Sequence, residues 1–247
     1  MEKSTYKVKY QTLKGGWVIY LLMASMVLSF LNMYAGIVSA AIGVILFLKF
    51  KRDPENNSAM FYNYAIKTLQ AGDSNKAKAA LTKAISLNRC NKEAYFFLGC
   101  LYFDEQDYTN ALEYLKLGGV DEAKDPSLTF ALGRCYYHTE NYDIAVRYLE
   151  MVEYQEGSKL EKDRLFTLGR AYSELEEYEK SLEALKKADI KMDELKGESL
   201  EYCYFVGIAC YHLDKDTEAK EYIKRVFDVD KVYKYVDLYA KNLGLTL

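Results

Sequence analysis

The sequence LGCLYFDEQDYTNALEYL at residues 98–115 contains the pattern that decides the fold. It starts with a Leu-Gly pair and a tyrosine, continues through polar residues, and ends with an alanine four residues before a leucine. The pattern returns as LGRCYYHTENYDIAVRYL (132–149), LGRAYSELEEYEKSLEAL (168–185) and VGIACYHLDKDTEAKEYI (206–223), and more weakly as YAIKTLQAGDSNKAKAAL (64–81). Self-similarity at a spacing of 34 to 38 residues predicts a repeat architecture.

Each copy is predicted to be a pair of helices joined by a short polar turn. In the second copy Tyr95, Leu98 and Tyr102 follow one another at spacings of three and four, which places them on one helix face. A glycine destabilises a helix interior by about 1 kcal/mol relative to alanine, so its recurrence at one slot predicts a close approach of a neighbouring helix. That slot holds Gly99, Gly133, Gly169 and Gly207. Since neither helix alone can bury its apolar face, the pairs must stack.

This pattern resembles the tetratricopeptide repeat (TPR) family, over residues 58–233. The resemblance implies an all-α, right-handed superhelical solenoid of about five helical hairpins, with repeats starting near 58, 92, 126, 162 and 200 and an array over 58–230. The family's proline near position 32 and its tryptophan at position 4 are absent, so repeat boundaries are expected to be less regular. Residues 231–247 are predicted to form a capping helix that buries Val232, Tyr235, Val236 and Tyr239.

The N-terminal part predicts a membrane anchor. A basic segment over 1–16 precedes a run from Gly15 to Leu48 without a charged side chain, and Lys49, Lys51 and Arg52 follow it. One helix over this run would be roughly 50 Å long, against a bilayer core of about 30 Å. The preferred interpretation of 17–50 is therefore a transmembrane helical hairpin, about 17–32 and 36–50, with a single long span as the alternative.

The charges that flank this run predict its orientation. Positive residues at both ends place both ends, and the repeats, on the cytoplasmic side. The chain is thus expected to be an integral membrane protein that contacts the lipid bilayer through 17–50. Residues 51–57 are read as a polar linker in which Pro54 ends the membrane helix.

Composition and motifs exclude several classes of function. The net charge is −3 although residues 1–52 are basic, so the repeats are acidic and unsuited to a nucleic-acid partner. Five cysteines predict no disulfide framework, and we expect them at packing positions. The sequence has no phosphate-binding glycine loop, zinc-protease motif or nucleophile elbow. We therefore expect no enzyme activity, cofactor, metal or small-molecule substrate, and we read His138 and His212 as groove-edge residues.

The family resemblance implies a concave groove lined by the first helix of each repeat, which would bind a protein or peptide. Its candidate residues are nine: Tyr62, Phe96, Phe130, Arg134, Tyr137, Phe166, Arg170, Tyr204 and Tyr211. In one interpretation the aromatic rings form the floor of a peptide channel, and the two arginines bind a carboxylate. In the other, the rings pack against adjacent helices and the arginines pair with Glu174 or Asp104.

Two functions remain open from the sequence. The first is a membrane-anchored scaffold or adaptor that recruits a protein partner through the groove. The second is an assembly factor or structural subunit of a membrane protein complex, in which the hydrophobic hairpin is itself an interface.

Overall fold

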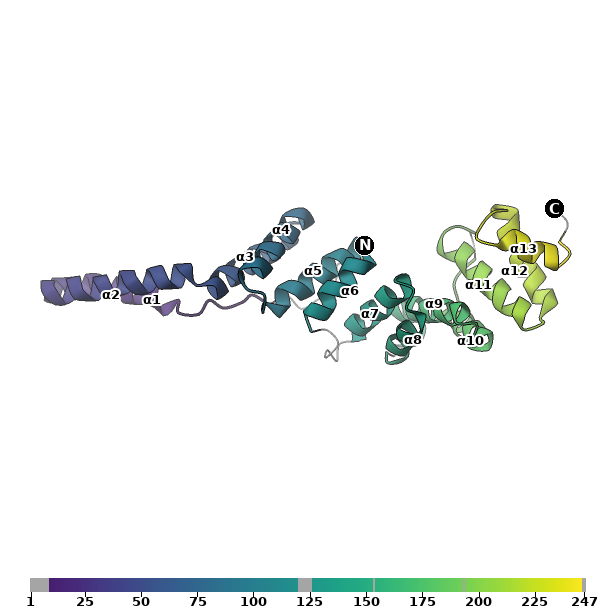
Figure 1. Ribbon diagram of the computed structural model, residues 1–247, viewed down its shortest axis with the longest axis horizontal. Coiled ribbons are helices and arrows are strands. Elements are labelled where there is room, and N and C mark those ends of the chain that lie inside the picture. The colour runs from purple at the N-terminus through teal and green to yellow at the C-terminus, as the bar shows by residue number, and fades with distance from the viewer. Residues whose placement is uncertain (1–8, 120–125, 153, 193, 246–247) are drawn as a thin grey trace. The chain divides into compact units, whose positions relative to one another are not determined.

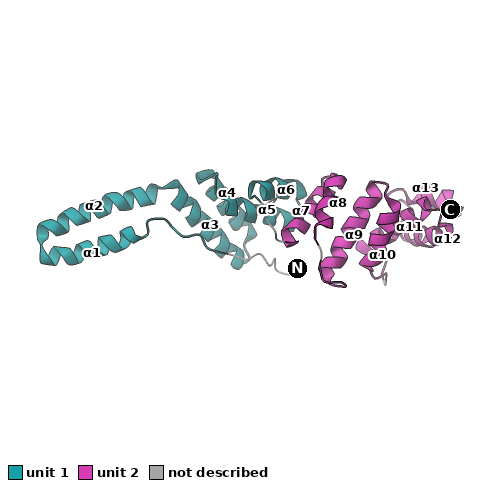
Figure 2. Ribbon diagram, turned by 90° about the horizontal axis from the view of Figure 1, so that it is seen from below, with its two compact units in different colours: residues 1–120 teal, residues 121–247 magenta. Residues whose placement is uncertain are grey.

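The computed structural model describes residues 9–119, 126–152, 154–192 and 194–245, and within them the chain forms thirteen α-helices and no β-strand (Figure 1). The helices belong to two compact units, residues 1–120 and residues 121–247 (Figure 2). The first helices of the predicted repeats begin at Pro54, Lys92, Pro126, Lys159 and Glu198. These residues lie within four positions of the predicted repeat starts.

The apolar N-terminal run folds as two antiparallel helices, α1 (Trp17–Leu31) and α2 (Met33–Arg52) (Figure 2). The turn between them is Asn32 alone, whose side chain accepts hydrogen bonds from the N–H groups of Tyr34 and Ala35. The helices touch through small residues. A Cβ added at Gly36 would lie 2.5 Å from Ser29 Cα. Such close backbone approach is typical of tightly packed membrane helices.

The predicted linker over 51–57 is wrong in its extent. Lys51 and Arg52 belong to α2, and α3 (Pro54–Gln70) begins directly after Asp53. The Asp53 carboxylate caps α3 by accepting from Glu55 N–H, and Pro54 occupies the first helical position. Proline is favoured there because its missing N–H would have no partner in the helix and its φ is already helical. Pro54 therefore starts a helix at the point where we expected it only to end one.

Besides the α1–α2 hairpin, unit 1 contains the first two helix pairs of the predicted repeats. Helix α3 packs on α4 (Ser74–Leu87), and α5 (Lys92–Asp104) packs on α6 (Tyr108–Leu117). The predicted close approach at the recurring glycine is confirmed, because a Cβ on Gly99 would lie 2.8 Å from Leu115 Cγ. The glycine therefore admits the leucine of the second helix of its own pair.

Unit 2 contains three more pairs and one short helix. The pairs are α7 (Pro126–His138) with α8 (Tyr142–Glu150), α9 (Lys159–Glu174) with α10 (Tyr178–Ala188), and α11 (Glu198–His212) with α12 (Asp216–Val229). The last helix is α13 (Val236–Asn242). Its Val236 and Ala240 join a core of α11 and α12 residues that includes Phe205 and Ile223.

The predicted capping helix starts later than expected. Residues 231–235 form turns, Val232 and Tyr235 are exposed, and only Val236 and Tyr239 of the predicted face lie against the core. The reason is local: Asp230 accepts a hydrogen bond from Val232 N–H, which holds a turn, and Lys234 has φ 48°. A left-handed residue interrupts a helix, so α13 can begin only after it.

Candidate functional site

The aromatic residues that were predicted to floor the groove are mostly covered by protein. Tyr62, Phe130, Phe166 and Tyr204 expose between 1% and 6% of their surface, and Phe96 is half-buried. Each ring packs against its neighbours. For example, the Tyr62 and Phe97 rings meet edge to face at 5.8 Å. This burial matches the interpretation in which the rings pack between adjacent first helices.

Arg170 is the centre of a charged group on the first helices of unit 2. Its guanidinium carbon lies 4.5 Å from the Tyr137 ring centroid and 4.7 Å from the Phe166 ring centroid. Its Nη1 donates to Glu201 Oε2 at 2.7 Å, so its partner is Glu201 and not Glu174. The Arg170 Nε is buried without a hydrogen-bond partner. The predicted residues Tyr137, Phe166 and Arg170 are thus brought together.

The sequence reasoning missed two members of this group, Glu201 and Lys234. The Lys234 Nζ lies 3.3 Å from Glu201 Oε1 and 4.2 Å from the Phe205 ring centroid. Beside it, Tyr233 packs edge to face on Tyr204 at 5.5 Å. The turn between α12 and α13 therefore covers Tyr204 and closes the charged group from that end. We call Tyr137, Phe166, Arg170, Glu201 and Lys234 the Arg170 cluster.

The surroundings of the Arg170 cluster affect nearby titratable groups. His138 is exposed, but desolvation by the surrounding protein lowers its pKa to about 4, and the positive charges of Arg170 and Arg134 add to this effect. Glu198 is also exposed, and desolvation on its protein side raises its pKa above the usual value, to which Asp163 adds. Arg134 remains half-exposed, with its guanidinium carbon 5.8 Å from the Phe130 ring centroid. The rim of the cluster therefore presents a cation beside carboxyl groups, an arrangement suited to polar contacts with a protein.

Tyr211 and the two histidines lie apart from one another. Tyr211 is half-buried and meets the Tyr239 ring of α13 edge to face at 5.2 Å. His212 stacks on Tyr178 at 4.1 Å, whereas His138 lies near Arg170. Among the described residues there is no group of three or more His, Cys, Asp or Glu side chains able to hold a metal ion.

Four of the five cysteines are buried, as their packing positions predicted, but Cys90 is exposed in the loop between α4 and α5. Burial raises the pKa of Cys135 to about 12 and that of Cys203 to about 11. Such thiols carry almost no thiolate at neutral pH and are unreactive. Cys90 therefore differs from these thiols in its access to solvent.

In unit 1 residues 9–14 lie along α3 (Figure 1). The Tyr62 hydroxyl donates to the Lys9 carbonyl at 3.0 Å, and three more α3 side chains bind this segment: Asn56, Asn63 and Gln70. Sequence reasoning missed all three. A signal was present, because they are seven residues apart and therefore share one helix face.

Comparison with known proteins supports the repeat fold. Residues 67–118 and 163–189 match two models of the tetratricopeptide repeat. Tetratricopeptide repeat protein 1 of Schizosaccharomyces pombe is 26% identical over 153 residues, which are 57% of this chain and 14% of that protein. The chain thus spans about a seventh of this relative's length.

Two solved structures share the fold. YrrB, a TPR protein with an unusual peptide-binding site, superposes with a TM-score of 0.55 at 18% identity, over 79% of this chain and 97% of YrrB. MamA AMB-1 superposes with a TM-score of 0.54 at 18% identity, over 77% of this chain and 97% of MamA. Residues 67–118 and 163–189 thus match the tetratricopeptide repeat, and the solved structures share the fold of the helix pairs.

Proposed function

We propose that this protein is a membrane-anchored TPR scaffold that recruits a protein partner on the cytoplasmic side. The observation that carries the proposal is the exposed apolar surface of the α1–α2 hairpin. Among the described residues α2 is the one helix that is long and apolar enough to cross a membrane, and 11% of its most apolar window is buried. At the tip, Phe30 is 91% exposed and Leu31 82%. Large exposed apolar patches mark protein or membrane interaction sites.

The polar groups of the hairpin are compatible with lipid. The hydroxyls of Ser25, Ser29 and Ser39 donate to carbonyls of their own helices, and Asn32 caps α2. A membrane core requires such internal pairing, because it offers no water to polar groups. At 1.5 Å per residue, α2 is about 30 Å long and α1 about 22 Å, against a hydrocarbon core of about 30 Å. Local thinning of the bilayer accommodates the shorter helix.

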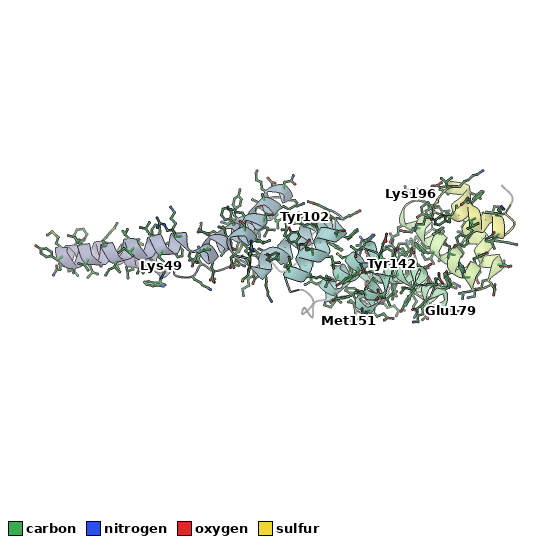
Figure 3. The ribbon with its side chains drawn as sticks, in the orientation of Figure 1. Lys49, Tyr102, Tyr142, Met151, Glu179 and Lys196 are labelled. Atoms are coloured by element: carbon green, nitrogen blue, oxygen red, sulfur yellow. The ribbon has the colours of Figure 1, made fainter. Side chains whose placement is uncertain are left out.

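Charge supports the cytoplasmic orientation. Lys14 precedes α1, and Lys49, Lys51 and Arg52 lie in the last turn of α2, so both ends of the hairpin carry positive charge. Figure 3 shows Lys49 at the end of α2 that adjoins the repeats. The positive-inside rule then puts these ends and the repeats in the cytoplasm.

The partner is proposed to dock on the first helices of unit 2, around the Arg170 cluster. Because the aromatic rings are buried, contact falls to the half-exposed Arg134 and to the rim carboxylates Glu198 and Glu201. Arginine donates in a fixed fork that suits a carboxylate, and the rim carboxylates suit a cation, so a partner segment that carries both charges fits this rim. Anchoring holds scaffold and partner at one surface and raises their effective concentration.

The membrane anchor and its orientation can be tested on Cys90, whose exposed thiol lies on the repeats. In sealed vesicles with the cytoplasmic face inside, a membrane-impermeant maleimide should label Cys90 only after permeabilisation, and a Cys90→Ser control should remain unlabelled. Labelling of intact vesicles would place the repeats on the opposite side. In a separate arm, Ile37→Lys with Val44→Lys should release the chain from membranes at alkaline pH, because lysine at the bilayer centre is strongly unfavourable.

A second experiment separates the scaffold from the alternative of a subunit that uses its hairpin as an interface. Residues 17–50 are replaced by an unrelated membrane hairpin, and Arg134→Glu is made in the native chain. A scaffold keeps its co-purified partner after the hairpin exchange and loses it with Arg134→Glu. A subunit whose hairpin is the interface shows the opposite pattern.

A further inference from the structure

The N-terminal segment at residues 9–14 lies in unit 1 against α3 and α5 and is held mainly through its backbone. Asn63 Oδ1 accepts from the Gln11 N–H at 2.8 Å, and Asn63 Nδ2 donates to the Gln11 carbonyl at 2.8 Å. Asn56 repeats this arrangement at Lys14, with distances of 2.8 Å and 2.9 Å. Each carboxamide thus binds both main-chain groups of one residue.

The spacing of the two asparagines matches an extended chain. Asn56 and Asn63 are seven residues apart on α3, which is about 10.5 Å along the helix axis and nearly the same face. Gln11 and Lys14 are three residues apart, which is about 10 Å in an extended chain. The segment therefore runs antiparallel to α3 and nearly fully stretched. One helical heptad farther, Tyr10 donates its hydroxyl proton to Gln70 Oε1 at 3.0 Å.

One side chain of the segment is also recognised. The Gln11 carboxamide exchanges two hydrogen bonds with Asn91, at 2.8 Å and 3.2 Å, and its Nε2 donates to Glu93 Oε2 at 3.2 Å. Asn91 is 5% exposed and holds its place by capping α5 and by donating to Ser58. At the other end, the Lys14 ammonium lies 2.5 Å from a Glu55 carboxylate oxygen.

The hydrogen bonds of the Asn56 and Asn63 side chains all go to the main chain of residues 9–14. Asn56 is 3% exposed, and both hydrogen bonds of its side chain go to Lys14. A buried carboxamide without a partner is unfavourable, so α3 presents amides that need an extended chain, or water, against them. Beside the segment, a pocket of about 630 Å³ remains between residues 9–14 and the α5 residues Phe96 and Phe97. The site has room for larger side chains than its present occupant supplies.

We infer that α3 and α5 form a binding site for extended peptides with a glutamine three residues before a lysine, and that residues 9–14 are its resident ligand. The contacts of Asn56 and Asn63 with the peptide main chain do not depend on the peptide's side chains. Asn91 and Glu93 provide the selectivity for glutamine. A partner peptide of this kind binds by displacing residues 9–14. This site lies in unit 1 and needs neither the membrane nor Arg134, so it is independent of the function proposed above.

Tethering sets the affinity range in which displacement can be measured. A segment joined by a short linker has an effective concentration on the order of millimolar. Since residues 9–14 occupy the site, their dissociation constant as a free peptide must lie below that value. Binding of a fluorescent peptide of residues 9–16, KYQTLKGG, to the full chain in detergent micelles is therefore measurable by anisotropy.

The test uses Gln11→Pro to empty the site. Proline has no N–H to donate to Asn63 Oδ1, and it lacks the carboxamide that hydrogen-bonds with Asn91. This variant should bind the peptide at least about twofold more tightly than the wild-type chain, whose own segment competes at its effective concentration. Adding Asn63→Ala should weaken peptide binding at least about tenfold. Adding Asn57→Ala should leave it unchanged, since Asn57 lies on the same helix but donates to the Lys51 carbonyl.

Three outcomes overturn the inference. These are equal binding to wild type and Gln11→Pro, no binding to Gln11→Pro, and equal losses from Asn63→Ala and Asn57→Ala. Circular dichroism of all four proteins shows that the helices are intact. Failure here leaves the membrane and Arg134 experiments unaffected.

Discussion

The Arg170 cluster predicts the effect of Glu201→Gln. This change keeps the shape of the side chain but removes the negative charge that Arg170 faces at 2.7 Å. The Arg170 side chain is 10% exposed and that of Glu201 24%, so the pair is largely but not fully withdrawn from water. Breaking a fully buried pair costs about 3–5 kcal/mol, and losing a surface pair costs less than about 1 kcal/mol. The two rings that sandwich Arg170 remain, so we expect a loss of about 2 kcal/mol.

Hydrogen exchange of α9 and α11 measures this loss, because repeat arrays open locally and do not unfold as one unit. A loss of 2 kcal/mol corresponds to exchange about 30-fold faster in these helices at neutral pH. Lys234→Met is the matched control. The Lys234 ammonium also contacts the Glu201 carboxylate, at 3.3 Å, but the Lys234 side chain is 36% exposed. The rate of hydrogen exchange should therefore rise less than about fivefold.

The double variant Arg170→Met with Glu201→Gln completes the test. Methionine fits between the Tyr137 and Phe166 rings and needs no counter-charge, so most of the lost protection should return. If Glu201→Gln changes exchange by less than about threefold, or if the double variant is less protected than the single one, Arg170 is not held by this ion pair.

Three further changes test the repeats. Glu140 has φ 62°, a conformation that glycine adopts without strain. Glu140→Gly should therefore raise the unfolding free energy by about 0.5 kcal/mol. A fall in melting temperature would contradict this expectation. Gly169→Val should lower it by roughly 1–3 kcal/mol in thermal unfolding, since even a Cβ would lie 2.6 Å from Leu185 Cγ. Arg164 lowers the pKa of Glu161, so this carboxylate stabilises the fold above its unfolded pKa of about 4.5 and loses that effect as pH falls through the lower folded pKa. Denaturation curves from pH 7 to pH 3 should show Glu161→Gln destabilised at pH 7, with the gap to wild type closing in acid; a constant gap would refute the ionic origin.

The sequence alone determined the helical pairs and their internal packing. Gly99 meets Leu115 of the same pair, only sixteen residues later, and Gly133, Gly169 and Gly207 make the equivalent contact in the three later copies. A contact that is short in sequence and repeated several times leaves a periodic signal. The sequence also predicted the apolar hairpin, because the length of the uncharged run and the lysines that flank it can be read from the sequence directly. Its membrane insertion stays a prediction until the Cys90 experiment is done.

The tertiary structure decided which surfaces are open. Tyr204 stands at the same position as Phe96, yet the turn at Tyr233 covers it. The sequence predicted a capping helix over 231–247 but did not indicate that the turn before it packs on Tyr204. The linker was misjudged because a proline both ends one helix and begins another, and only the capping by Asp53 distinguishes the two.

The contacts between residues 9–14 and α3 show the limit most clearly. They join residues 42 to 60 positions apart through single polar groups, and they occur once. The close helix contact at the recurring glycines could be predicted because it is repeated along the sequence. A unique contact between distant polar residues has no periodicity, so only the folded chain brings Gln11 to Asn63.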